Sequence, residues 1–152
     1  MKAVIALGAN LDDPKAAMEL AVGLLKEATD FLAVSSFHKT KPVGGPPQDD
    51  FLNAICIIES ELTPRELLNL MHGIEKSMGR VREEKWGPRV IDLDLITYGD
   101  LVSSDPDVLL PHPRAHERAF VLAPWLEIDP QAQLPGHGPV EQLLSSLQLD
   151  SI

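Results

Sequence analysis

The sequence has little of what several large classes of protein depend on. It contains one cysteine, Cys56, within the apolar run AICII, so a disulfide framework is excluded and the thiol is expected to be a small buried hydrophobe. The apolar run before Gly8, AVIAL, is too short for a signal peptide or a membrane span. We therefore expect a cytoplasmic protein, with residues 1–152 forming one domain that is long enough to bury a core.

Positive charge and aromatic residues are also scarce. The chain has 13 Lys and Arg against 23 Asp and Glu, a net charge of −10, and 5% aromatic residues. Nucleic acids and anionic membranes select basic surfaces, and RNA-binding sheets also need aromatic residues, so we expect neither as a partner. We expect instead a monomer that acts on small molecules.

The few cations that are present lie close together. Five of them fall between residues 76 and 89, namely Lys76, Arg80, Arg82, Lys85 and Arg89. A local basic cluster on an acidic chain suits a small anion. The sequence has neither G-x-x-x-x-G-K-S/T nor G-x-G-x-x-G, so a nucleotide would not be held by either glycine-rich loop.

Apolar periodicity and turn residues predict the order strand, helix, strand, strand, helix, strand, over residues 3–7, 14–28, 31–38, 51–60, 64–79 and 90–98. Asp13 is the expected cap of the first helix, and Thr63 with Glu66 forms a capping box for the second. This order is typical of a ferredoxin-like α+β fold, an antiparallel sheet with helices packed on one face. Two long loops, at 41–50 and 80–89, are expected on the side left free for a ligand, and short helices are expected around 115–122 and 140–148.

The stretch WGPRVIDLDLI places two carboxylates one residue apart within the last of these strands. Side chains at positions i and i+2 share a face, so Asp92 and Asp94 would lie together, with Val90, Ile96 and Tyr98 flanking them. The plain alternative is a solvated strand face. Adjacent carboxylates repel each other, however, and Mg²⁺ prefers one or two carboxylates together with phosphates and water, so the basic loop upstream favours a metal–phosphate site.

Two other pairs of residues are candidates. Phe51 and Asn53 share a strand face, and an aromatic ring beside an amide suits a planar, hydrogen-bonding heterocycle, although taken alone a Phe here is more often a core residue and an Asn a strand-edge residue. His112 and His116 have zinc-like spacing, but prolines flank His112 and no third ligand is near. His112 is better explained as a hydrogen-bond donor to phosphate or as a structural residue.

Read together, these segments resemble the 6-hydroxymethyl-7,8-dihydropterin pyrophosphokinase family almost from end to end. The matching segments are ALGANL, VSSFHKTKPVG, FLNA, GRVREEKWGPRVIDLDLI and LPHPRAHERAFVLAP. The resemblance implies a ferredoxin-like fold, ATP as co-substrate and two Mg²⁺ ions as cofactor. It implies transfer of a diphosphate group to the pterin hydroxymethyl oxygen with release of AMP, a step of folate biosynthesis.

The resemblance also implies roles for individual residues. Asp92 and Asp94 would bind the metal ions, and Arg80 and Arg89 would be catalytic. The residues on the nucleotide side would be Glu75, Arg82, Lys85, Trp86, His112 and Arg118. The residues on the pterin side would be Phe51 and Phe120 as a sandwich, Asn53, and the backbone of Thr40, Pro42 and Val43.

Two alternatives remain open. Another Mg²⁺-dependent nucleotide enzyme, such as a nucleotidyltransferase or a sugar transferase, would explain the aspartates but neither WGPR nor Phe51 with Asn53. A non-catalytic ferredoxin-like module that binds a regulatory ligand would need neither aspartate.

Overall fold

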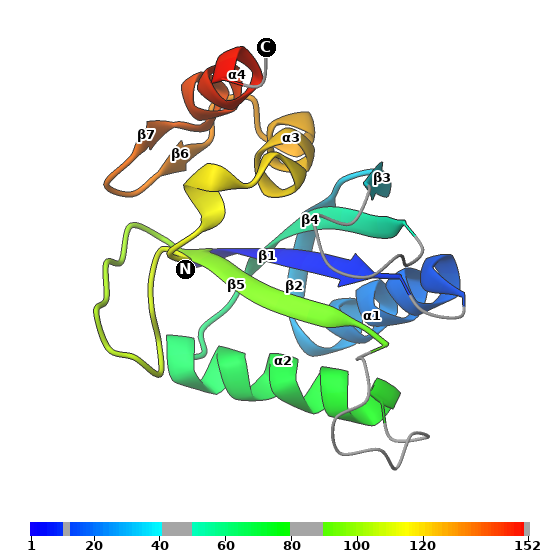
Figure 1. Cartoon of the computed structure of the whole chain (residues 1–152). Coiled ribbons are helices and arrows are strands. Elements are labelled where there is room, and N and C mark those ends of the chain that lie inside the picture. The colour runs from blue at the N-terminus through cyan, green and yellow to red at the C-terminus, as the bar shows by residue number, and fades with distance from the viewer. Residues whose placement is uncertain (11–12, 41–49, 80–89, 151–152) are drawn as a thin grey trace.

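A five-stranded antiparallel sheet forms the centre of the computed structural model, which describes residues 1–10, 13–40, 50–79 and 90–150 (Figure 1). The main strand order is β2-β4-β1-β5, and the short β3 pairs with the start of β4. The strands are β1 (Lys2–Ala9), β2 (Asp30–Val34), β3 (His38–Thr40), β4 (Phe51–Glu59) and β5 (Asp92–Tyr98). The single strand expected over 31–38 is therefore two, β2 and β3, separated by residues 35–37.

The two long helices that follow β1 and β4 cover one face of this sheet (Figure 1). Helix α1 (Pro14–Ala28) begins at Asp13, whose side chain accepts a hydrogen bond from the backbone of Ala16, at 3.2 Å. Helix α2 (Pro64–Gly79) has the expected capping box: Thr63 N donates to Glu66 Oε1 at 2.9 Å, and Glu66 N donates to Thr63 Oγ1 at 3.2 Å. Both predicted helix starts are confirmed.

The core between these helices and the sheet contains the residues expected there. The apolar stripe that a period of 3.6 residues predicts for α2 is buried at Leu67, Met71 and Ile74, and its fourth member, Met78, is partly buried against the same core. Cys56 is fully buried in the same core, and burial raises the pKa of its thiol to about 12. The thiol is therefore a packed, protonated hydrophobe, as predicted. Among the described residues, no helix combines the length and apolar character needed to span a bilayer.

The opposite face of the sheet is partly covered by the C-terminal third of the chain. The sequence predicts that this whole face would be free for a ligand. A short 3₁₀ turn (Ala115–Glu117), α3 (Ala119–Ile128), the hairpin β6 (Gln133–Leu134) and β7 (Gly138–Pro139), and α4 (Val140–Asp150) lie above it (Figure 1). They form a second core with sheet residues that include Val4, Ile55 and Ile96. The α+β class with an antiparallel sheet is confirmed, but only one end of this face is open.

Strand β5 differs from the expected pattern in two ways. It begins at Asp92, two residues later than predicted. It also carries a bulge, because Val4 pairs with Thr97 while Ile5 pairs with Leu95, so the residue between them, Ile96, has no direct partner. The extra residue reverses the alternation, and Tyr98 packs into the first core instead of flanking the two aspartates. Val90 packs against that core as well, which leaves Ile96 as the one predicted neighbour on the acids' face.

Candidate active site

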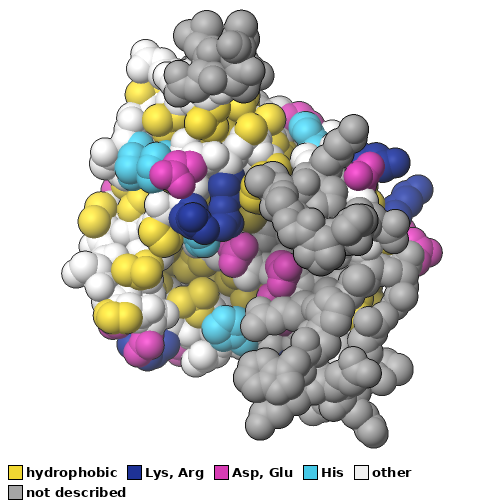
Figure 2. Space-filling model, viewed as in Figure 1, with side chains coloured by type: hydrophobic (Ala, Val, Ile, Leu, Met, Phe, Trp, Pro, Cys, Tyr) yellow, Lys and Arg dark blue, Asp and Glu magenta, His cyan; other side chains and the backbone are white. Residues whose placement is uncertain are grey.

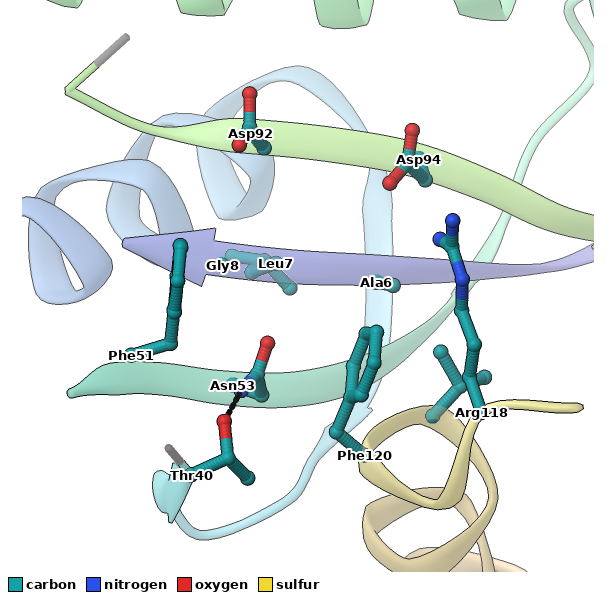
Figure 3. Close-up of a pocket in the computed structure, with 11 residues that line it drawn as sticks. Ala6, Leu7, Gly8, Thr40, Phe51, Asn53, Asp92, Asp94, Arg118 and Phe120 are labelled. Carbon is teal, nitrogen blue, oxygen red and sulfur yellow. Dashed lines mark hydrogen bonds between the residues drawn. The ribbon is translucent and has the colours of Figure 1, made fainter. Parts of the chain in front are cut away.

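A cavity of about 270 Å³ opens on the uncovered end of the second face (Figure 3). Strands β1, β3, β4 and β5 and the start of α3 contribute its walls. The lining residues are Ala6, Leu7, Gly8, Thr40, Phe51, Asn53, Asp92, Asp94, Arg118, Phe120 and Val121. The structure therefore brings both predicted metal ligands and four of the predicted pterin-side residues into one pocket.

Small residues of β1 form the floor of this cavity. Gly8 lies between Asn53 of β4 and Asp92 of β5, and Ala6 lies in the same way beside Asp94. A Cβ atom at Gly8 would stand 3.3 Å from Asn53 Oδ1, closer than most side-chain contacts. The absence of a side chain at Gly8 therefore leaves space in the cavity between the amide of Asn53 and the carboxylate of Asp92. Sequence reasoning gave Gly8 no role, although a glycine inside an apolar strand is a known sign of close approach by a ligand or backbone.

An amide between two aromatic rings forms one end of the cavity. In Figure 3, Phe51 of β4 and Phe120 of α3 stand on either side of Asn53. Asn53 is 8% exposed, and its Nδ2 donates to Thr40 Oγ1, so the amide is oriented with its oxygen toward the cavity. The arrangement offers flat apolar surfaces together with a fixed hydrogen-bond acceptor, which fits the edge of a planar heterocycle.

The two aspartates form the other end. Asp92 and Asp94 project from β5 on the cavity side, while Leu93 between them is buried in the first core (Figure 3). The backbone N–H of Leu93 donates to Glu75 Oε2 of α2 at 2.9 Å, so Glu75 contacts the strand between the two acids. Within the described part of the chain, no group of three or more His, Cys, Asp or Glu is placed so that it could hold a metal ion. Two carboxylates that face a cavity fit Mg²⁺, which keeps water and phosphate oxygens as its other ligands.

Cationic and neutral nitrogen donors lie beside Asp94. The guanidinium of Arg118 approaches it in Figure 3 and is centred 5.5 Å from the ring of Phe120. The backbone of His112 is tied to β5 by a 2.9 Å bond to Ile96 O. Figure 2 shows basic, acidic and histidine side chains gathered on this face.

The surroundings of His112 favour the neutral form of its side chain, because they lower its pKa. Partial burial lowers its pKa most, Asp94 opposes that shift, and Arg118 and Arg114 lower the pKa further. Nδ1 of His112 accepts a bond from the backbone N of Arg114 at 3.2 Å, so Nε2 carries the proton and is the available donor. Arg114, to which sequence reasoning assigned no role, is thus part of the surroundings of His112.

Seven of the predicted site residues lie outside the described residues: Arg80, Arg82, Lys85, Trp86, Arg89, Pro42 and Val43. Their roles stay predictions. The same holds for the two expected loops, of which the structure describes only Asp50.

Comparison with known proteins adds to this geometry. The family model for 7,8-dihydro-6-hydroxymethylpterin-pyrophosphokinase matches residues 4–130. The chain belongs to this pyrophosphokinase family. Three relatives named 2-amino-4-hydroxy-6-hydroxymethyldihydropteridine pyrophosphokinase illustrate the match. The protein of Bacillus subtilis is 43% identical over 86% of this chain and 80% of its own length. The protein of Methylorubrum extorquens is 41% identical over 99% of this chain and 96% of its own length. The protein of Haemophilus influenzae is 38% identical over 93% of this chain and 90% of its own length.

Solved structures of the family support the fold. A solved structure of HPPK-DHPS in complex with substrates matches with a TM-score of 0.76 at 11% identity, and the match covers 99% of this chain and 43% of the other. The wild-type Plasmodium falciparum HPPK-DHPS with SDX-DHP matches with a TM-score of 0.73 at 12% identity, covering 95% and 44%. This chain therefore spans less than half of those longer chains. At 11–12% sequence identity, the similarity to these solved structures shows only that the fold is shared.

Proposed function

We propose that the protein transfers a diphosphate group from ATP to the hydroxymethyl oxygen of 6-hydroxymethyl-7,8-dihydropterin and releases AMP, a step of folate biosynthesis. The observation that supports this most is a single cavity with an amide between two phenyl rings at one end and two carboxylates at the other. Membership of the pyrophosphokinase family agrees with it. The proposal includes a cytoplasmic monomer with small-molecule substrates and no nucleic acid partner.

At the heterocycle end, Phe51 and Phe120 would sandwich the pterin. Asn53 Oδ1 would accept a hydrogen bond from the pterin edge, since Thr40 already occupies the amide nitrogen. The backbone of Thr40, Pro42 and Val43 would pair with the rest of that edge. The cavity then leaves the hydroxymethyl group pointing toward β5, where the carboxylates stand.

At the phosphate end, Asp92 and Asp94 would hold two Mg²⁺ ions. Bound there, Mg²⁺ would neutralise phosphate charge. The two carboxylates that line the cavity supply oxygen ligands, which this ion prefers. His112 would donate through Nε2 to a phosphate oxygen, and Arg118 would pair with another. Glu75, Arg82, Lys85 and Trp86 complete the proposed nucleotide side.

The reaction needs positioning and charge stabilisation more than covalent chemistry. The hydroxymethyl oxygen forms a bond to the β-phosphorus and loses its proton to solvent, and the bond from that phosphorus to the α,β-bridging oxygen breaks, so that this bridging oxygen departs with AMP. Negative charge spreads over the phosphate oxygens, and Arg80 and Arg89 are proposed to stabilise it. No protein nucleophile is required.

One assay tests the proposal against both alternatives. Protein, Mg²⁺, ATP and 6-hydroxymethyl-7,8-dihydropterin are mixed, and the nucleotide and pterin products are separated by chromatography. We expect AMP to form in equal amount with the pterin diphosphate. Formation of ADP would indicate a different phosphotransferase. ATP consumption that does not depend on the pterin, or none at all, would also refute the proposal.

A further inference from the structure

A three-hydrogen-bond contact joins the end of α3 to the segment between β2 and β3. Glu127 Oε2 accepts from the backbone N of Ser36 at 2.6 Å, and its Oε1 accepts from Ser36 Oγ at 2.7 Å. His38 Nε2 lies 2.7 Å from the same Oε1. We call this group, Glu127 with Ser36 and His38, the Glu127 clamp. Its hydrogen bonds hold the pKa of Glu127 well below the usual range, at about 2, so the carboxylate stays ionised.

The segment between β2 and β3, which the Glu127 clamp holds, is also bonded to β4. Ser35 is 4% exposed and bonds twice to β4: its N donates to Ile55 O at 2.8 Å, and its Oγ accepts from Ile55 N at 3.0 Å. Ser36 therefore stands between β4 and α3, with bonds to the helix side. The clamp thus connects α3 to the sheet and not to a free surface turn.

The two elements joined by the clamp carry opposite parts of the heterocycle end. Residue His38 begins β3, and Thr40 ends it, where the Thr40 hydroxyl orients the amide of Asn53. Helix α3 carries Phe120 near its start and Glu127 near its end. Figure 1 shows α3 beside β3 and β4. The position of the Phe120 ring relative to Asn53 therefore depends on how α3 is seated on β3.

We propose that Glu127 is a positioning residue for the heterocycle half of the site, holding α3 against β3 so that Phe120 and Asn53 keep the spacing that a planar ring needs. This inference rests on the proposed function. Glu127 is not among the described residues that line the cavity, and it lies near the opposite end of α3 from Phe120. Its larger effect is on the binding of the pterin, because Asp92, Asp94 and His112 on the phosphate side are positioned by β5, and Arg118, the N-cap of α3, is the described phosphate-side residue that would move with Phe120.

The substitution Glu127→Gln tests this role, because it removes the charge and one acceptor oxygen while leaving the size of the side chain nearly unchanged. The amide has one side-chain oxygen instead of two, so it cannot accept all three bonds, and its NH₂ group would face a donor. We expect the KM for the pterin to rise about tenfold and the KM for ATP to rise by a clearly smaller factor, since Arg118 is the described phosphate-side residue on α3. Ser36→Ala removes one bond of the clamp and should raise the pterin KM by a smaller factor in the same direction. The double variant should show less than the product of the two effects, because both changes break the same contact.

Glu141→Gln is the matched control, an exposed carboxylate in the first turn of α4 that makes no contact with the cavity. Thermal unfolding of every variant identifies any general loss of structure. Calorimetric titration with 6-hydroxymethyl-7,8-dihydropterin in the absence of ATP gives its Kd directly, which should rise with the KM.

The outcomes distinguish the inference from the proposed function. Wild-type protein without pterin-dependent AMP formation would refute the function, and the calorimetric Kd would still decide on the clamp. Active wild type with an unchanged pterin KM and Kd in Glu127→Gln would overturn the positioning role while leaving the function standing. Equal increases in the KM for pterin and for ATP would also overturn it, because they would indicate a general structural effect.

Discussion

The Asp92 and Asp94 pair makes the sharpest prediction, which concerns metal-dependent stability. Replacing Asp94 by Asn removes one charge without changing the size of the side chain. Asp92 is exposed and Asp94 partly exposed, so the substitution leaves no cavity in the core. Any loss of function would then reflect lost metal or phosphate binding and not unfolding.

Without ligands, the effect on stability is expected to be small. Alternate side chains on a strand are separated by about 6.7 Å, which corresponds to a repulsion of about 0.6 kcal/mol between two unit charges in water. Arg118 beside Asp94 offsets part of this, because its attraction is lost together with the repulsion. The free energy of unfolding should therefore change by less than about 1 kcal/mol in either direction.

With ligands, the difference should be large. A ligand at 100 times its Kd stabilises the native state by about 2.7 kcal/mol, and each kcal/mol shifts the Tm of a chain of this size by about 2–4 °C. Mg²⁺ with a non-hydrolysable ATP analogue should therefore raise the Tm of the wild type by about 5–10 °C. Asp94→Asn should lose most of this shift and most turnover.

The measurement is a thermal unfolding scan with EDTA, with Mg²⁺, and with Mg²⁺ plus the analogue. Asp100→Asn is the control, since this exposed carboxylate follows β5 and lies outside the cavity lining. It should keep the full shift. A full Mg²⁺-dependent shift and near-normal activity in Asp94→Asn at limiting Mg²⁺ would refute the metal assignment.

Three further predictions concern single contacts. Gly8→Ala should raise the pterin KM several-fold with little change in Tm, because its Cβ would stand 3.3 Å from Asn53 Oδ1; an unchanged KM would remove Gly8 from the binding surface. Because the folded-state pKa of Glu127 is below its unfolded value, the clamp stabilises the fold above about pH 4.5 and loses this contribution as the pH falls toward about 2. The free energy of unfolding of the wild type should exceed that of Glu127→Gln by about 1 kcal/mol at pH 7, after allowance for solvent screening, and the urea midpoints of the two proteins should converge in acid. Thr63→Ala should cost about 1 kcal/mol in urea denaturation through loss of the capping box with Glu66 and leave turnover unchanged.

The helices could be predicted from the sequence because their signals are local. Asp13 and Thr63 cap the ends at which they stand in the sequence, and the stripe of Leu67, Met71 and Ile74 needs only a period of 3.6 residues. Such signals require no knowledge of the rest of the chain. The antiparallel sheet with helices on one face followed from the order of elements along the chain.

The bulge in β5 could not be predicted in the same way. Alternation along DLDLITY places Tyr98 with the acids, and only the pairing of Val4 with Thr97 shows that Ile96 is an extra residue. The pairing partner is more than ninety positions away in the sequence. Burial of Tyr98 in the first core, where its hydroxyl bonds to Leu62 O, decides the register after that point.

The candidate site was predictable where its residues share one strand. Asp92 with Asp94, and Phe51 with Asn53, stand two positions apart and must share a face. Contacts between distant segments were not predictable, and the Glu127 clamp is an example, since it joins α3 to Ser36. An exposed glutamate at the end of a helix carries no signal of its partner. The coverage of the second sheet face by α3 and α4 was missed for the same reason, because the proline-rich C-terminal third gives weak periodicity.

The position of the two acids on an edge strand raises a physical question, because edge strands have unpaired backbone groups and are less constrained than central ones. Here the free edge of β5 is satisfied on both sides of Asp94. The N–H of Leu93 donates to Glu75, and the carbonyl of Ile96 accepts from the backbone of His112. Residues from α2 and from the segment before α3 therefore fix the strand that carries the acids. An edge position exposes the carboxylates to a ligand, and these two bonds supply the rigidity that precise charge placement requires.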